Sequence, residues 1–172
     1  RTRDIWNLRR CRQAAMKVVS NTTPIIWLAS INRLDILEKL FGEIIIAEAV
    51  YSEIKAKQGY GYEQVDSHFI NVQRIQGQLY KNFLLTQLDL GEAETIILAK
   101  ELTADFVIID ENLGYRFANN VGLTAIRTLS LLLKAKEKGF ITEAKPLLDD
   151  MIDKGRWYSN TVYRSFLAKA GE

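Results

Sequence analysis

Residues 106–112 read Phe-Val-Ile-Ile-Asp-Glu-Asn, an apolar run that ends abruptly in two carboxylates. Such a short run of aromatic and β-branched residues is typical of a strand that helices cover on both faces, as in a parallel sheet. Ligands of open α/β sheets bind outside the carboxyl ends of the strands. Polar residues that directly follow this strand, Asp110 and Glu111, are therefore candidates for a functional site.

A second stretch has the same character. Residues 18–24 read Val-Val-Ser-Asn-Thr-Thr-Pro, where a predicted strand runs into polar residues that open a helix. If the two strands are neighbours in the sheet, Asn21, Thr22 and Thr23 face Asp110 across its carboxyl edge.

The remaining chain alternates between strand and helix patterns, which predicts one α/β domain with a central, mainly parallel sheet of about four to five strands flanked by helices. Strands are expected at 17–20, 44–46, 106–109 and 123–125, with 71–75 either an edge strand or a plain connector. Helices are expected at 24–30, 33–40, 47–57, 79–85, 92–102 and 111–120. From Thr128 on, the pattern changes to three amphipathic helices at 128–138, 143–154 and 160–169, so the domain 16–172 has a helical C-terminal extension over 128–172.

Composition restricts the chemistry. Apolar residues make up 48% of the chain, enough for one core without disulfides. Cys11 and His68 are the only residues of their types, which excludes a zinc cluster, a Cys/His dyad and a Ser/His/Asp triad within one chain. Catalysis must therefore depend on carboxylates. The lone cysteine and the lack of a membrane-length apolar stretch predict a soluble cytoplasmic protein with no membrane partner.

Charge is distributed unevenly. Residues 1–15 contain five arginines and one aspartate, and from Met16 on 18 Lys and Arg face 20 Asp and Glu. A faintly acidic body argues against a broad surface for duplex DNA and leaves room for a short single strand. Residues 1–15 lack a start methionine and an apolar run, so we expect a disordered leader or cloning-derived tail, with a basic RNA-binding arm as the alternative.

Two helices bring further acids toward the same edge. Glu53 lies in the helix predicted at 47–57. Asp89 and Glu92 have the spacing of a capping box, which explains Glu92 locally. Glu94 follows in an otherwise apolar helix, where a carboxylate needs a cation or hydrogen-bond donors to remain ionised. We therefore expect Glu94 to bind a metal ion, with an ordinary position on a solvated helix face as the alternative.

Five stretches together resemble the bacterial PIN-domain proteins, in the branch related to VapC-type toxins. In order, they are VVSNTTPIIWLA (18–29), FGEIIIAEAVYSEI (41–54), LDLGEAETIILAKEL (88–102), VIIDENLGYRFANNVGL (107–123) and TLSLLLKAKEKGFI (128–141). The resemblance covers nearly all of residues 16–172 and implies a three-layer PIN-like fold. It also implies a nuclease that uses Mg²⁺ or Mn²⁺, for which hard oxygen ligands are suited.

The resemblance also implies a set of site residues. The four acidic positions of the family fall at Asn21, Glu53, Glu94 and Asp110, which would be catalytic and bind the metal. Glu111 would assist as a further ligand. The residues expected to contact the metal or the RNA substrate are Thr22, Thr23 and Arg116, although Arg116 could equally be a surface arginine of its helix. The hypothesis depends on Glu53, Glu94 and Asp110 sharing one pocket.

Asn21 departs from the family pattern, in which aspartate is common. Its carbonyl oxygen can still bind a cation, but the amide carries no charge and cannot act as a base, so we expect weaker metal binding and weakened activity. Asn21 could instead be only the N-cap of the following helix, and one side chain could do both.

The resemblance implies a metal-dependent endoribonuclease that acts as the toxin of a type II toxin-antitoxin pair, with an antitoxin partner and a homodimeric state. The alternative is a catalytically weak or inactive PIN-like module that binds protein or RNA. A receiver or hydrolase domain is a third reading by fold analogy, weakened because the first strand lacks a carboxylate nucleophile and no glycine-rich phosphate loop is present. Trp157 and Tyr158, beside Arg156 in a predicted loop, are candidates for stacking on RNA or docking a partner.

Overall fold

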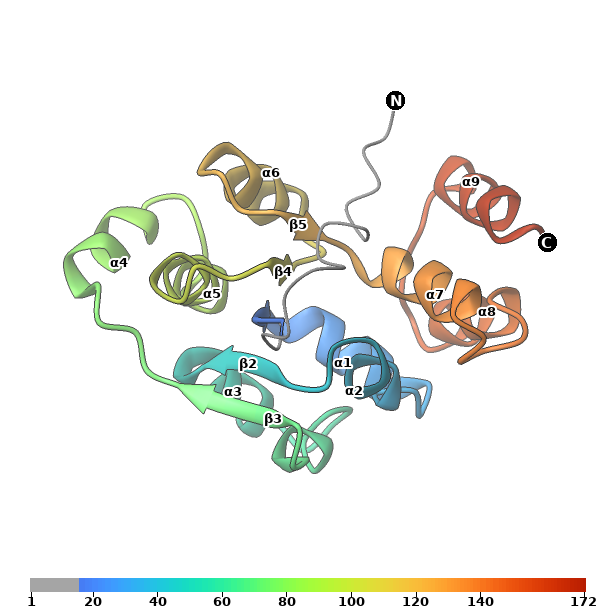
Figure 1. Cartoon of the computed structure of the whole chain (residues 1–172), viewed down its shortest axis with the longest axis horizontal. Coiled ribbons are helices and arrows are strands. Elements are labelled where there is room, and N and C mark those ends of the chain that lie inside the picture. Colours follow the sequence, from blue (N-terminus) through green and yellow to red (C-terminus); the bar gives the residue numbers. More distant parts are fainter. Residues whose placement is uncertain (1–15) are drawn as a thin grey trace.

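The computed structural model describes residues 16–172, so the predictions for residues 1–15 lie outside the described part of the chain. Its five strands form one parallel sheet in the order β3-β2-β1-β4-β5 (Figure 1). They are β1 (Val18–Ser20), β2 (Ile44–Ala47), β3 (Ile70–Gln73), β4 (Phe106–Ile108) and β5 (Ala125–Ile126). Of the two alternatives for residues 71–75, the edge strand is confirmed, because β3 pairs with β2 at one side of the sheet.

Nine α-helices lie within residues 16–172, together with a short 3-10 turn at Gln64–Asp66. They are α1 (Thr22–Ser30), α2 (Asp35–Phe41), α3 (Glu48–Lys55), α4 (Gln78–Leu84), α5 (Leu90–Glu101), α6 (Asn112–Asn120), α7 (Thr128–Glu137), α8 (Lys145–Asp153) and α9 (Asn160–Ala170). Figure 1 shows α4 at one end of the molecule and α7, α8 and α9 together at the other. The predicted α/β fold and the helical C-terminal extension are confirmed.

Helix α5 lies at the centre of the fold. Residues 91–99 are all buried, because the helix packs against α3, β1, β2 and β4. A helix that is buried on every side needs few polar residues, which explains its apolar sequence. The predicted capping box is present: Glu92 N donates to Asp89 Oδ1 at 2.7 Å and Asp89 N donates to Glu92 Oε2 at 3.3 Å. The start of α5 is thereby fixed beside the carboxyl edge of the sheet.

The C-terminal helices are held by side-chain contacts as well as by packing. Helix α7 packs against α2 and α9, and Phe166 of α9 is buried. The Glu172 carboxylate accepts hydrogen bonds from Ala144 N and Lys145 N, both at 2.7 Å, and pairs with Lys136 at 2.5 Å. It therefore caps the start of α8 from a distant part of the chain. No helix within the described range 16–172 combines the length and the hydropathy that crossing a bilayer requires.

We predict that Glu172→Gln destabilises the protein at pH 7 and much less at pH 3. The Ala144 N–H and the Lys136 ammonium lower the pKa of Glu172 to about 2. A carboxylate with a lowered pKa contributes its full stability above its unfolded pKa of about 4.3, and that stability falls to zero as the pH drops through about 2. Urea denaturation at both pH values measures the difference.

The matched control is Glu137→Gln, which removes an exposed carboxylate that pairs with Lys134 within one helix. Such surface pairs contribute little, so this variant should unfold like the parent at both pH values. A Glu172→Gln protein that loses equal stability at pH 7 and pH 3 would contradict the assignment of the effect to the charge.

Candidate active site

The carboxyl ends of β1 and β4 meet side by side. Ser20 pairs with Ile108 in the sheet, and the Asn21 N–H donates to Ile108 O at 2.9 Å, one residue beyond the strand. Asn21 Nδ2 then donates to Glu111 Oε2 at 3.3 Å, and the Thr23 hydroxyl donates to the other oxygen of the same carboxylate. The structure thus brings together Asn21, Thr23 and Glu111.

Asn21 occupies the N-cap position of α1, but its side chain does not cap the helix. The side-chain amide instead bonds to α5 and to the segment after β4. Its oxygen accepts a hydrogen bond from Thr95 Oγ1 at 3.5 Å, and its nitrogen donates to Glu111. Its side chain is buried, so it cannot rotate freely into solvent. The amide is therefore held in place beside the carboxylates.

Three oxygen atoms converge on Gly91 at the start of α5. A Cβ atom at Gly91 would lie 2.9 Å from Glu53 Oε2, 3.3 Å from Asn21 Oδ1 and 3.5 Å from Asp89 Oδ1. Thr22 Oγ1 donates to Glu53 Oε2 at 2.6 Å and orients that carboxylate. We refer to Asn21, Glu53, Asp89 and Glu111 as the acidic cluster. Glu53 and Asp89 are exposed, so the cluster opens to solvent.

Glu92 lies beneath this cluster and is 5% exposed. Its Oε1 atom would be 2.6 Å from a Cβ at Gly114, which places the carboxyl group between α5 and α6. Burial, together with the nearby charges of Asp89 and Glu111, raises the pKa of Glu92. Sequence reasoning explained Asp89 and Glu92 as a capping box alone, and nothing in that spacing indicates that Glu92 also lies near Glu111.

Glu94 contacts different groups. Its carboxylate accepts a hydrogen bond from Ala49 N at 3.1 Å, at the start of α3, and pairs with Lys81 of α4 at 2.9 Å. The side chain is buried, and these contacts supply the cation and the donor that a buried carboxylate requires. Glu94 thus joins α5 to α3 and α4.

Asp110 faces the start of α7. Thr128 donates to it twice, from its backbone N at 2.8 Å and its hydroxyl at 2.9 Å, and Arg156 Nη2 lies 3.4 Å from Oδ2. Burial raises the pKa of Asp110, although the Thr128 N–H and the Arg156 charge partly oppose the shift. Arg127 Nη1 also donates to the Asp110 carbonyl oxygen at 2.8 Å. Arg127 and Thr128 directly follow β5. Polar residues directly after β1 and β4 are site candidates, and the same criterion applied to β5 would have selected these two residues.

Glu53, Glu94 and Asp110 share no hydrogen-bond or ion-pair partner among the described residues. Glu53 contacts Thr22, Glu94 contacts Ala49 and Lys81, and Asp110 contacts Thr128 and Arg156. From residue 16 onward, no three His, Cys, Asp or Glu side chains form a group that could hold a metal ion. The three carboxylates of the acidic cluster do not form such a group, but oxygens of Glu53 and Asp89 gather with the Asn21 amide oxygen at Gly91. Within the described chain, none of the cluster's carboxylates forms an ion pair with lysine or arginine, and such hard oxygen donors fit Mg²⁺ or Mn²⁺. Arg116 is exposed, and its Nε donates to Asn112 O of its own helix at 3.4 Å.

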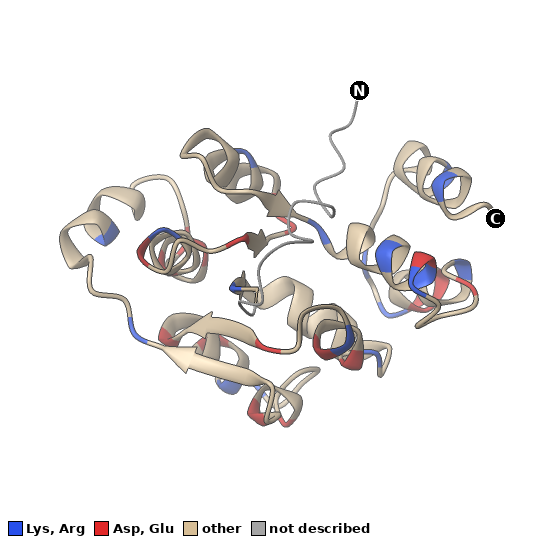
Figure 2. Cartoon of the chain, viewed as in Figure 1, with Lys and Arg blue, Asp and Glu red and all other residues tan. Residues whose placement is uncertain are grey.

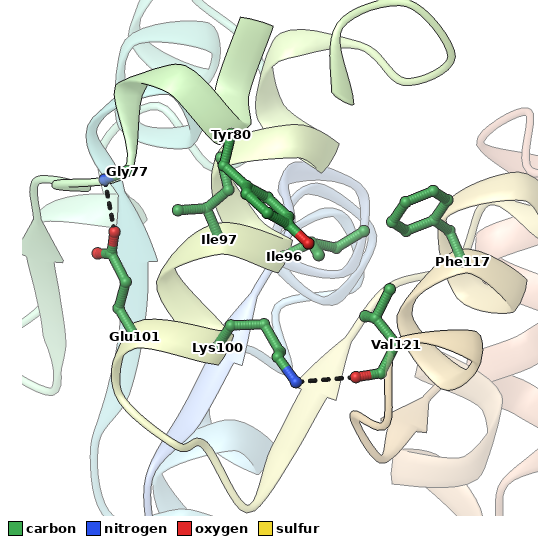
Figure 3. A pocket seen from close by; sticks show the side chains of 8 residues that line it. All are labelled: Gly77, Tyr80, Ile96, Ile97, Lys100, Glu101, Phe117 and Val121. Carbon is green, nitrogen blue, oxygen red and sulfur yellow. Dashed lines mark hydrogen bonds between the residues drawn. The ribbon is translucent and has the colours of Figure 1, made fainter. Parts of the chain in front are cut away.

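A separate apolar pocket of about 370 Å³ lies over the other half of α5 (Figure 3). It is lined by Gly77, Tyr80, Ile96, Ile97, Lys100, Glu101, Phe117 and Val121. Its two charged residues are engaged with backbone: Lys100 Nζ donates to Val121 O at 2.8 Å, and Glu101 accepts from Gly77 N at 2.7 Å. This pocket therefore offers no free carboxylate for hydrolysis.

We predict that Gly114→Ala destabilises the protein while Gly91→Ala does not. A Cβ at Gly114 would lie 2.5 Å from Ile109 Cδ1 and 2.6 Å from Glu92 Oε1, so we expect a loss of about 1–3 kcal/mol from overpacking. At Gly91 the nearest atom is the end of the flexible, exposed Glu53 side chain, and alanine favours the helix. Urea denaturation of both variants measures this contrast, and equal losses would contradict the geometry.

Comparison with known proteins agrees with this architecture. A family model for the PIN domain matches residues 17–172. Among curated proteins, none matches the chain. PIN domains are generally nucleases, and they generally use divalent metal ions. Since the match spans all but one of the described residues and the chain has the α/β sheet with flanking helices expected of such a domain, the protein belongs to the PIN-domain family.

Proposed function

We propose that this PIN-domain protein is a metal-dependent endoribonuclease that hydrolyses phosphodiester bonds of RNA. The observation that carries the proposal is the acidic cluster at the carboxyl edge of the sheet, where oxygens of Glu53, Asn21 and Asp89 gather at Gly91 and Glu111 is joined to them through Asn21 Nδ2. No carboxylate of the cluster forms an ion pair with lysine or arginine among the described residues, and negative groups gathered in this way favour a bound cation.

Within this proposal, Asn21, Glu53 and Glu111 hold Mg²⁺ or Mn²⁺, with Asp89 at the rim. When bound, such an ion lowers the pKa of water and offsets charge that develops on the phosphate. Thr22 and Thr23 each donate a hydrogen bond to a cluster carboxylate and so fix the direction of its oxygens. Residues that hydrogen-bond to metal-binding side chains commonly orient those side chains in this way.

Glu94 and Asp110, the other two acids that the family resemblance selects, act in this proposal through the elements they hold. Glu94 anchors the start of α3, the helix that carries Glu53. Asp110 precedes Glu111 and anchors this segment to Thr128 of α7. Loss of either acid would therefore displace a cluster carboxylate.

A binding module without catalysis is the second candidate, and specific observations favour it. Asn21 removes one charge from the site, and Lys81 and Arg156 pair with Glu94 and Asp110. The described residues also lack a group of three acids on one metal position. In this case the protein would bind RNA or a protein and would not cleave.

The resemblance to VapC-type toxins supports a finer proposal: a cytoplasmic toxin that forms a homodimer and is held inactive by an antitoxin. An exposed apolar surface on α4 is consistent with a protein partner. Leu79, Tyr80 and Phe83 are 87%, 62% and 63% exposed, and neighbouring apolar residues exposed to this degree mark interaction sites. Light scattering of the purified protein tests the dimer, and co-purification with the product of an adjoining short reading frame tests the antitoxin.

We predict that the protein cleaves RNA with Mn²⁺ or Mg²⁺ and not with chelator. Glu53→Gln and Glu111→Gln should each lower the cleavage rate by about 100-fold or more, because each removes a ligand charge. Both variants should keep the parent's unfolding midpoint, since neither carboxylate pairs with a cation among the described residues. Gel assays on structured and single-stranded RNA measure the rate.

Glu48→Gln is the matched control on the same helix. Glu48 is exposed and lies 3.7 Å from Arg74, so this variant should cleave at the parent's rate. Asp110→Asn and Glu94→Gln should lower both the rate and the unfolding midpoint, because each loses contacts that hold a helix. Absence of cleavage by the parent with either metal, or cleavage that persists in Glu53→Gln and Glu111→Gln, would favour the binding module.

A further inference from the structure

Two arginines flank Asp110, next to the acidic cluster. Arg127 Nη1 donates to the Asp110 carbonyl oxygen at 2.8 Å, and Arg156 Nη2 lies 3.4 Å from its carboxylate. The two side chains come from separate places, one directly after β5 and the other after α8. The next residue, Glu111, belongs to the acidic cluster. Positive groups therefore lie beside the site at which a phosphodiester would be cleaved.

Each of these arginines also lies over aromatic rings. The Arg127 guanidinium is 4.2 Å from the centre of the Tyr115 ring, and that of Arg156 is 5.7 Å from Trp27 and 5.3 Å from Tyr158. An arginine has five N–H donors. Arg127 donates to Asp110 and Asn112, and Arg156 donates to Tyr158 and Asp110, so donors of both remain for a phosphate.

Trp157 follows Arg156 and is 79% exposed. The loop that carries it is held on both sides. Arg156 N donates to Met151 O at 2.9 Å, and Ser159 caps α9 by accepting from Val162 N. Gly155, at φ +101°, makes the turn between α8 and this loop. The indole ring is thus displayed to solvent on a fixed segment, where its aromatic face is available to a ligand.

The chemistry of this surface matches a single-stranded nucleic acid. Exposed aromatic rings stack on unpaired bases, and adjacent arginines contact the phosphates. Elsewhere, Figure 2 shows basic and acidic residues together on α2, α3, α5, α7 and α8, which is a poor surface for a duplex backbone. A protein segment needs apolar contacts but has no general need for two arginines beside an acidic cluster.

We propose that Trp157 is a stacking platform for an unpaired base of single-stranded RNA, whose phosphates contact Arg127 and Arg156. The inference rests on the proposed function, because it places the RNA so that its backbone reaches the acidic cluster. A paired base is enclosed in its helix and cannot stack on the indole, so Trp157 selects for single strands.

The test is RNA binding without cleavage. Fluorescence anisotropy of a labelled RNA of about ten nucleotides, in chelator, measures affinity for the single strand and for the same RNA as a duplex. Trp157→Ala should weaken single-strand binding by about fivefold or more and leave duplex binding unchanged. Trp157→Phe keeps an aromatic face and should stay within about threefold of the parent. Tyr60→Ala, at an aromatic residue that is 50% exposed and lies in the segment after α3, should bind like the parent.

Unchanged single-strand affinity in Trp157→Ala would overturn the proposal and indicate a protein segment as the occupant of this surface. Equal losses for the single strand and the duplex would also overturn it, because the effect would then not arise from stacking on an unpaired base. Single-strand binding that depends on Trp157, in a protein that cleaves RNA with neither metal, would support this inference while removing the proposed function. The two proposals can therefore fail separately.

Discussion

The backbone hydrogen bond from Asn21 N to Ile108 O is the interaction on which the candidate site depends. It extends the pairing of β1 and β4 by one residue and so determines which side chains meet beyond the strands. Val18, Val19, Val107 and Ile108 are fully buried, and side chains in a core pack too closely for either strand to slip by one residue without losing contacts. The hydrophobic core therefore sets the register of the site.

This register separates two neighbouring acids. Successive side chains of an extended segment point in opposite directions, so Glu111 meets Asn21 while Asp110 meets Thr128. Buried carboxylates need compensation, and Asp110 and Glu94 receive it from Arg156 and Lys81. The carboxylates of the acidic cluster lie closer to solvent and form no such pair within residues 16–172. The fold thus distinguishes acids that hold helices from acids that are available to a cation.

The C-terminal helices belong to the same arrangement. Thr128 begins α7 and binds Asp110, Arg156 leaves α8 and reaches the same carboxylate, and Glu172 returns to cap α8. The extension therefore supports the carboxyl edge of the sheet directly. It also supplies Arg156 and Trp157, two of the residues that we propose to contact RNA, so that the proposed metal ligands and these proposed RNA contacts come from different parts of the chain.

The sequence by itself determined the local features: the buried strand that precedes Asp110, the order of short strands and helices along the chain, the Asp89–Glu92 capping box and the placement of Asn21 at a helix start. Each depends on neighbours within a few residues, so a local pattern encodes it. Only the tertiary structure decided which acids face one another. Glu94 depends on Lys81 of another helix, and Asp110 on Arg156, 46 residues away. Such pairs depend on strand register and helix packing, which no local pattern records.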